Sequence, residues 1–97
     1  MSIMEIKYDI GDFVPVLTEQ KVLCDIVNNV RKRRKEMKLS QKKLATRSGV
    51  SYASIRRFES CGEISFNSLL KIADVLNCLN DFTQLFSHEI LFNLKEY

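Results

Sequence analysis

The sequence predicts a single all-α domain of five helices. Over most of the chain, apolar residues recur every three or four positions, a spacing that places them on one face of a helix. Four of these stretches follow a hydroxyl side chain that can accept hydrogen bonds from the first helical turn. These predicted N-caps are Thr18, Ser40, Ser51 and Ser65. A length of 97 residues suits one domain, and Pro15 is the only proline.

An N-terminal arm is expected at residues 1–16, outside the helical core. Within it, "IMEIKYDI" alternates with a period of two, which predicts a short strand or an extended segment. The first helix is predicted to begin after Thr18 and to run to about Lys38. Apolar side chains form a stripe along its first half, whereas its second half contains the basic run "RKRRK" at residues 31–35 and should lie on the surface.

Two short helices should follow, separated by a tight turn. Ser40 is predicted to cap the first of them, and Gly49 is placed to end it in the left-handed conformation. Ser51 is predicted to cap the second, which should run to about Ser60. Two short helices joined through a glycine-containing turn are typical of a helix-turn-helix.

The last part of the chain predicts two more helices and a tail. Ser65 should cap a fourth helix that ends between Asn77 and Asn80, and Asp81 should cap a short fifth helix. The apolar residues of that fifth helix are Phe82, Leu85 and Phe86. The helix-turn-helix core is therefore predicted at residues 17–86, with its motif at 40–60.

The C-terminal tail, residues 87–97, is apolar at several positions and lies outside the motif core. The tail and the N-terminal arm are candidates for a dimer contact, in which either could pair as a strand across a two-fold axis. The alternative is that both segments cover the core of their own monomer.

Charge is distributed unevenly along the chain. The net charge is only +3, but eleven of the fifteen Lys and Arg residues lie between Arg31 and Arg57, together with only one of the twelve acidic residues, Glu36. A cationic block within an otherwise acidic protein indicates a polyanionic partner such as nucleic acid or a membrane surface. A solvated helix face is the alternative for the basic run alone.

Other function classes are disfavoured by the residues present. No apolar run approaches the roughly 20 residues of a membrane-spanning helix, and the N-terminus lacks the features of a secretory signal, so we expect a cytoplasmic protein without a membrane partner. Cys24, Cys61 and Cys78 are widely spaced and His88 is the only histidine, so no metal site is expected. No nucleophile–base pair or glycine-rich phosphate loop indicates an enzyme, and no cofactor is expected.

The stretch "LSQKKLATRSGVSYASIRRFE" resembles the phage-repressor (Cro/C1, or XRE) class of helix-turn-helix proteins. Their pattern is Leu-Ser-Gln, two variable residues, Leu-Ala, three variable residues, Gly-Val-Ser, three variable residues, Ile, three variable residues, Glu. The matching residues are Leu39, Ser40, Gln41, Leu44, Ala45, Gly49, Val50, Ser51, Ile55 and Glu59. "SLLKIADVL" is also similar to the family's fourth helix, so that the resemblance covers residues 26–86. It implies that the second helix of the motif lies in the major groove of DNA.

The resemblance implies base-reading positions on that helix. They are Tyr52, Ala53 and Arg57, with Arg56 alongside. An arginine can donate two hydrogen bonds to O6 and N7 of guanine, and an alanine can contact the thymine methyl group. The spacing agrees, because Ile55, Phe58 and Glu59 form the opposite stripe. A solvated charged surface is the alternative for the two arginines.

Phosphate contacts and a structural ion pair are implied as well. The phosphate candidates are Gln41, Lys42, Lys43, Arg47, Ser51 and Ser54, of which the two serines have helix capping as an alternative role. In relatives, an arginine of the first helix pairs with the glutamate near the end of the third, and Arg34 and Glu59 match these positions. The loop "SCGEIS" departs from relatives that have a basic residue there, since it contains Glu63 instead.

The sequence thus predicts a transcriptional regulator, with repression the favoured mode. It would bind double-stranded DNA as a homodimer, on a two-fold operator whose half-sites lie one DNA turn, roughly 34 Å, apart. A narrower hypothesis is an autoregulatory antitoxin, because "RRFESCGEISFNSLLKIADVL" together with "DFTQLF" resembles members associated with HipA-type kinase toxins. A toxin would then be a second partner. The alternative is a protein-interaction module that keeps the fold without binding DNA, which the cationic outer stripe of the third helix disfavours.

Overall fold

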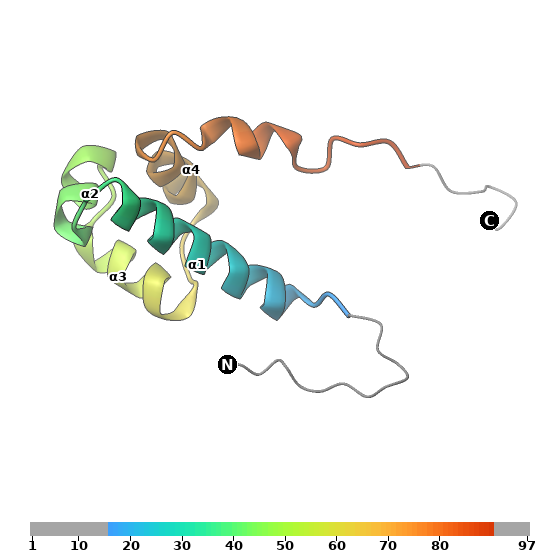
Figure 1. The fold of residues 1–97 in the computed structure, drawn as a ribbon, viewed down its shortest axis with the longest axis horizontal. Helices are drawn as coiled ribbons and strands as arrows, with labels where there is room; N and C mark the ends of the chain where they lie inside the picture. The colour runs from blue at the N-terminus through green and yellow to red at the C-terminus, as the bar shows by residue number, and fades with distance from the viewer. Residues whose placement is uncertain (1–15, 91–97) are drawn as a thin grey trace, which may run out of the picture.

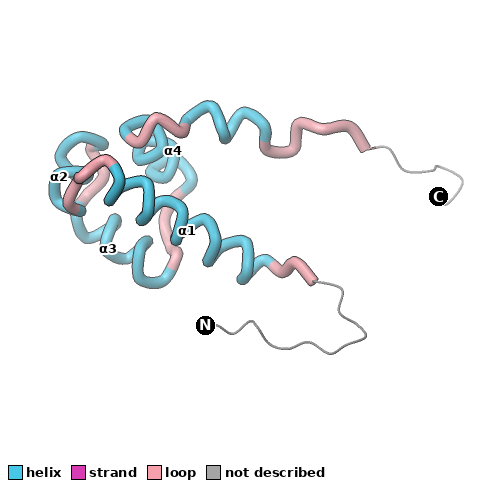
Figure 2. The backbone as a smooth tube through the Cα atoms, viewed as in Figure 1, coloured by secondary structure: helices cyan, strands magenta, loops and turns pink. Residues whose placement is uncertain are grey.

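A computed structural model of the chain describes residues 16–90, and within them all regular structure is helical (Figure 1). The elements are α1 (Glu19–Glu36), α2 (Gln41–Ser48), α3 (Tyr52–Cys61), α4 (Phe66–Val75) and the 3-10 helix η3 (Leu79–Gln84). Figure 2 shows the short loops that join them. The predicted all-α fold is confirmed. The two segments expected to form strands, the arm at residues 1–16 and the tail at 87–97, lie largely outside the described residues. Their described parts, Val16 and residues 87–90, contain no strand.

Each α-helix begins with a hydroxyl side chain that caps its first turn. The side-chain oxygen of every cap accepts a hydrogen bond from the backbone N–H three residues later. The four caps are Thr18, Ser40, Ser51 and Ser65. All four predicted helix starts are confirmed, because this capping depends only on residues close together in the chain.

Gly49 ends α2 in the left-handed conformation, with φ 79°, and its N–H donates to the carbonyl of Ala45. A Cβ atom at this position would have nothing within 4 Å. Glycine is therefore favoured in the turn of the helix-turn-helix by the left-handed backbone and not by crowding from neighbouring atoms.

The fifth helix differs from the prediction. It is a 3-10 helix that starts at Leu79, so Asp81 lies in its first turn and does not cap it, and Leu85 and Phe86 lie beyond its end. The difference arises at the end of α4, where Asn77 adopts φ 62° and the N–H of Cys78 donates to the carbonyl of Ala73. Because of this turn, η3 begins at Leu79, two residues before Asp81, the cap that the sequence predicts.

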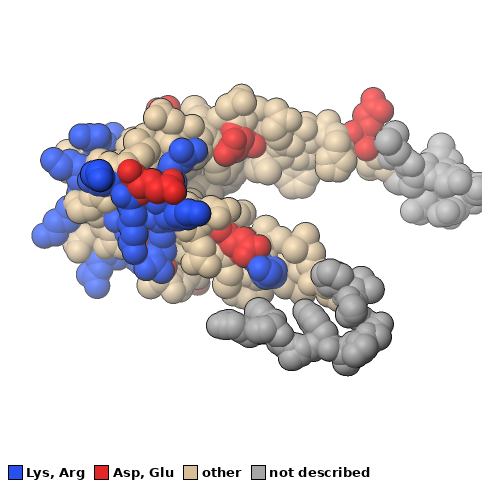
Figure 3. Space-filling view, viewed as in Figure 1, with Lys and Arg blue, Asp and Glu red and all other residues tan. Residues whose placement is uncertain are grey.

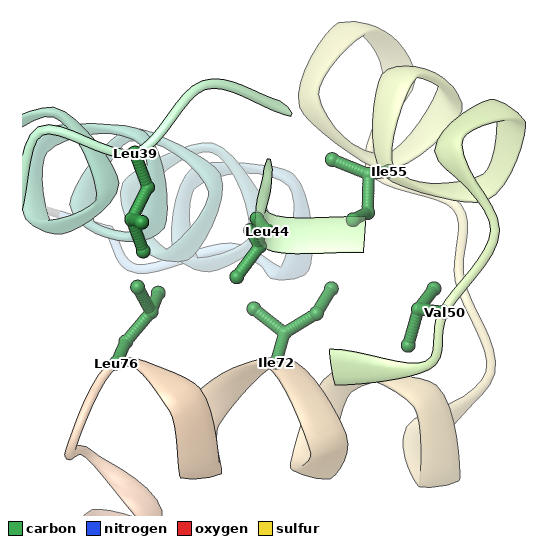
Figure 4. Close-up of a cluster of buried hydrophobic side chains, with 6 residues drawn as sticks. All are labelled: Leu39, Leu44, Val50, Ile55, Ile72 and Leu76. Atoms are coloured by element: carbon green, nitrogen blue, oxygen red, sulfur yellow. The ribbon is translucent and has the colours of Figure 1, made fainter. Parts of the chain in front are cut away.

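Six buried apolar side chains join the helix-turn-helix to α4 (Figure 4). They are Leu39, Leu44, Val50, Ile55, Ile72 and Leu76. Ile72 and Leu76 point from α4 towards Leu44 and Leu39, and α2 packs against both α3 and α4. The inner sides of α2 and α3 are thereby fixed, which leaves their outer sides to solvent.

The molecule has two distinct ends. The two helices of the motif lie with the C-terminal half of α1 at one end, whereas the N-terminal half of α1 and residues 79–90 extend from the other (Figure 1). Among the described helices, none combines the length and the apolarity that crossing a membrane would require.

Candidate DNA-binding surface

The side chains of α3 divide between a buried and an exposed face. The buried residues are Ile55, Phe58 and Glu59, and the exposed ones are Tyr52, Ala53, Arg56 and Arg57. Spacings of three and four residues along one helix produce this division. The four positions expected to read bases thus lie together on the solvent side of α3.

Lys and Arg side chains gather at the same end of the molecule as α2 and α3 (Figure 3). Basic residues of α1 and α3 line one groove there, together with the small side chain of Ala53. The basic residues of this groove are Arg31, Arg34, Lys35, Arg56 and Arg57. The structure therefore joins the basic run of α1 to the exposed arginines of α3 in one cationic surface.

Tyr52 connects the two helices of the motif through its ring. Lys42 Nζ of α2 lies 5.4 Å from the ring centroid, and Cζ of Arg56 lies 5.6 Å from it. Each cation–π contact at such an exposed site is worth about 0.5–1 kcal/mol. The ring therefore helps to hold one cation from each helix at the surface.

Arg57 is paired with the carboxylate of Glu63, in the loop after α3. Its Nε donates to Glu63 Oε1 at 2.9 Å, and its Nη2 donates to the same oxygen. This hydrogen bond and the charge of Glu63 raise the pKa of Arg57. From the sequence, Glu63 was notable only because it stands where relatives have a basic residue. Its pairing with Arg57 could not be predicted, because residues six apart and separated by a turn follow no helical spacing.

Arg34 and Glu59 form a buried, two-pronged ion pair between α1 and α3. Arg34 Nε donates to Glu59 Oε2 at 2.7 Å, and Arg34 Nη2 donates to Glu59 Oε1 at 2.9 Å. Arg34 Nη1 also donates to the carbonyl of Leu39 at 2.9 Å. Gln41 Nε2 adds a further hydrogen bond to Glu59 Oε1, also at 2.9 Å. The network ties α1, the start of α2 and α3 together directly beneath the exposed face.

Opposing effects act on the pKa of Glu59. Burial raises it, but hydrogen bonds from Arg34 and Gln41 and the charges of Arg34 and Arg31 outweigh burial, and the net pKa lies below its ordinary value of 4.5. A carboxylate that is more acidic in the folded than in the unfolded state stabilises the fold above its unfolded pKa.

We therefore expect stability to fall as the pH drops below about 4.5 towards the folded pKa of Glu59, where the unfolded chain binds a proton that the folded chain does not. In Glu59→Gln this contribution is missing. The difference in free energy of unfolding between the native protein and Glu59→Gln, from urea denaturation, should be larger at pH 7 than at pH 3. A difference independent of pH would contradict the expectation, and Asp74→Asn, an exposed acid, serves as the control.

Comparison with known proteins identifies the family. A helix-turn-helix family model matches residues 30–79, which is more than half of the chain and includes all of α2, α3 and α4. The chain belongs to the Cro/C1-type helix-turn-helix family. Members of this family are DNA-binding transcription regulators. Comparisons with curated proteins and with solved structures gave no match.

In this Cro/C1-type protein, the residues expected to contact phosphates are placed in different ways. Lys42, Lys43 and Arg47 are exposed on α2. Ser51 caps α3, and its hydroxyl also donates to that of Ser54 at 2.8 Å. The capping role that the sequence left open for Ser51 is therefore present. Gln41, at the first position of α2, belongs to the hydrogen-bond network of Glu59 as described above.

Proposed function

We propose that this Cro/C1-type protein is a cytoplasmic repressor that binds double-stranded DNA sequence-specifically as a homodimer. The outer face of α3 carries the proposal, because Arg56 and Arg57 are exposed there beside Tyr52 and Ala53. Arginine on a helix that enters the major groove makes the commonest specific contact to guanine. This cationic face favours DNA binding over a module that only binds proteins.

Dimerisation is supported by an apolar surface away from the motif. A groove between α1, α4 and η3 is lined by Ile26, Leu69 and Phe82 among others, and none of its lining residues belongs to α2 or α3. Leu85 borders this groove, and the next residue, Phe86, is 99% exposed. Apolar surface of this kind marks interaction sites on soluble proteins. A second copy bound here would leave α3 of both protomers free for DNA, and one motif alone buries little surface.

The proposal extends to an antitoxin role through the resemblance of the segment from α3 to α4 to members associated with HipA-type kinases. Such a kinase would be a second protein partner. Adding the candidate kinase to a gel-shift assay should then change the affinity of the protein for its operator, and an unchanged affinity would count against the role.

Selection of bound duplexes from random DNA tests the main proposal. We expect enriched sites with two related half-sites, centred about one DNA turn apart, and a guanine in each. Enrichment of a single half-site would contradict the dimer. Recovery of no sequence at all would favour the protein-interaction module.

The exposed basic residues of α2 should set the salt dependence of binding. Replacing Lys42, Lys43 and Arg47 together by glutamine is expected to make the slope of log affinity against log salt concentration shallower, by about 0.9 for each phosphate that the variant no longer neutralises. Preference among DNA sequences should change little, because phosphate contacts do not read bases. Fluorescence anisotropy at several salt concentrations measures the slope. Lys71→Gln, which removes an exposed charge from α4, should leave it unchanged.

A further inference from the structure

The loop after α3 places a carboxylate against the arginine proposed to read bases. Glu63 Oε1 accepts from both Nε and Nη2 of Arg57, and both side chains are largely exposed, at 65% for Arg57 and 61% for Glu63. The pair lies at the surface that would face DNA. Its effect there depends on which edge of the guanidinium the carboxylate occupies.

A guanidinium has five N–H donors in a fixed, planar fork. The N–H of Nε and one N–H of Nη2 share the side edge of the fork, whereas Nη1 and the second N–H of Nη2 share its end edge. Glu63 occupies the side edge of Arg57. Within residues 16–90, no hydrogen bond is made to the end edge, and its two parallel donors suit O6 and N7 of guanine.

Gly62 is the reason that the chain can return to Arg57 at this point. It ends α3 in the left-handed conformation with φ 82°, and its N–H donates to the carbonyl of Phe58. A Cβ atom at position 62 would come within 2.9 Å of Leu23 Cδ2 on α1. The left-handed backbone therefore favours glycine, and any larger residue would also require the Leu23 side chain to shift. The resulting turn sets Glu63 beside the last turns of α3.

We propose that Glu63 is a positioning residue, which holds the side edge of Arg57 so that its end edge is presented to guanine. This inference rests on the proposed DNA-binding function. Arginine is long and flexible, so a partner that fixes it before binding lowers the entropy lost when the base contact forms. The carboxylate also repels phosphates, which weakens binding to any DNA. Glu63 therefore increases discrimination between bases while it decreases affinity for DNA in general.

Glu63→Gln separates the two effects. We expect its affinity for random duplex to rise, and its discrimination between the selected site and a site with one guanine replaced by adenine to fall by about two- to tenfold, the range that ordering one long side chain is worth. Equilibrium anisotropy titrations with the three duplexes measure both quantities. Asp74→Asn, the same change of charge on α4, should alter neither.

A second background shows whether Glu63 acts through Arg57. Lysine has no planar fork, so in Arg57→Lys the further change Glu63→Gln should leave base discrimination as it is. A drop in discrimination in that background as well would overturn the proposal. The proposal would also be overturned if Glu63→Gln raised the affinity for all three duplexes by the same factor, since the carboxylate would then only repel DNA. If the native protein itself prefers no sequence, the proposed function fails first, and this inference fails with it.

Discussion

Replacing Glu59 by alanine is expected to lower the free energy of unfolding by about 3–5 kcal/mol. The substitution leaves the guanidinium of Arg34, whose side chain is only 9% exposed, without its carboxylate partner. Gln41 loses its acceptor on the same carboxylate. Because small domains are stable by only about 5–15 kcal/mol in total, this one change would remove a large part of the stability.

Two comparisons distinguish a buried, unpaired charge from a general loss of packing. Arg34→Met combined with Glu59→Leu removes both charges and should recover most of the loss, because apolar residues of similar volume often replace a buried ion pair without cost. Asp25→Ala breaks the exposed pair with Lys21 and should cost less than about 1 kcal/mol. Urea denaturation followed by circular dichroism measures all three variants. A loss below about 1 kcal/mol for Glu59→Ala would show that the pair is effectively solvated.

The ion pair also bears on function, because Glu59 lies on the buried face of the helix whose opposite face carries Arg56 and Arg57. A helix held by two hydrogen bonds to α1 and one to α2 has little freedom to rotate about its axis. Rotation would move the base-reading side chains off the solvent face. The same contacts that stabilise the domain therefore orient the surface proposed to bind DNA.

The parts of the fold that the sequence predicted well are those determined by neighbouring residues. Ser40 and Ser51 cap through the N–H three positions on, and Gly49 adopts the left-handed turn that its position indicated. The fifth helix was misplaced because Asp81 has the chemistry of a cap, yet the left-handed turn at Asn77 starts the helix earlier. A local signal could not reveal this competition.

The candidate site was less accessible to sequence reasoning, because its contacts join different elements. The helical spacing placed Arg57 on the outer face, but only the turn at Gly62 shows that Glu63 comes back to meet it. Gln41 was expected to contact phosphate, and no pattern in the sequence indicated its hydrogen bond to Glu59, eighteen residues away. Such pairs depend on how helices pack, which periodicity along one helix does not determine.

Arg57→Ala is expected to abolish the preference for guanine in each half-site. One bidentate arginine–guanine contact is worth about 1–3 kcal/mol of discrimination, so a dimer without both of these contacts should lose about 2–6 kcal/mol of specificity for a symmetric operator. The ratio of affinities for the selected site and for random duplex measures this loss. Arg47→Ala, on α2, is the matched control, and it should weaken binding to both duplexes to a similar extent.

The ratio is the decisive quantity because Arg57→Ala changes two interactions. It removes the proposed base contact, and it also leaves the carboxylate of Glu63 unpaired beside the DNA, which would weaken binding to every sequence. Adding Glu63→Gln to Arg57→Ala removes that repulsion, so affinity for random duplex should recover while the preference for guanine stays absent. If the double variant regains the preference, another residue reads the base, and Arg56, exposed on the same face, becomes the candidate.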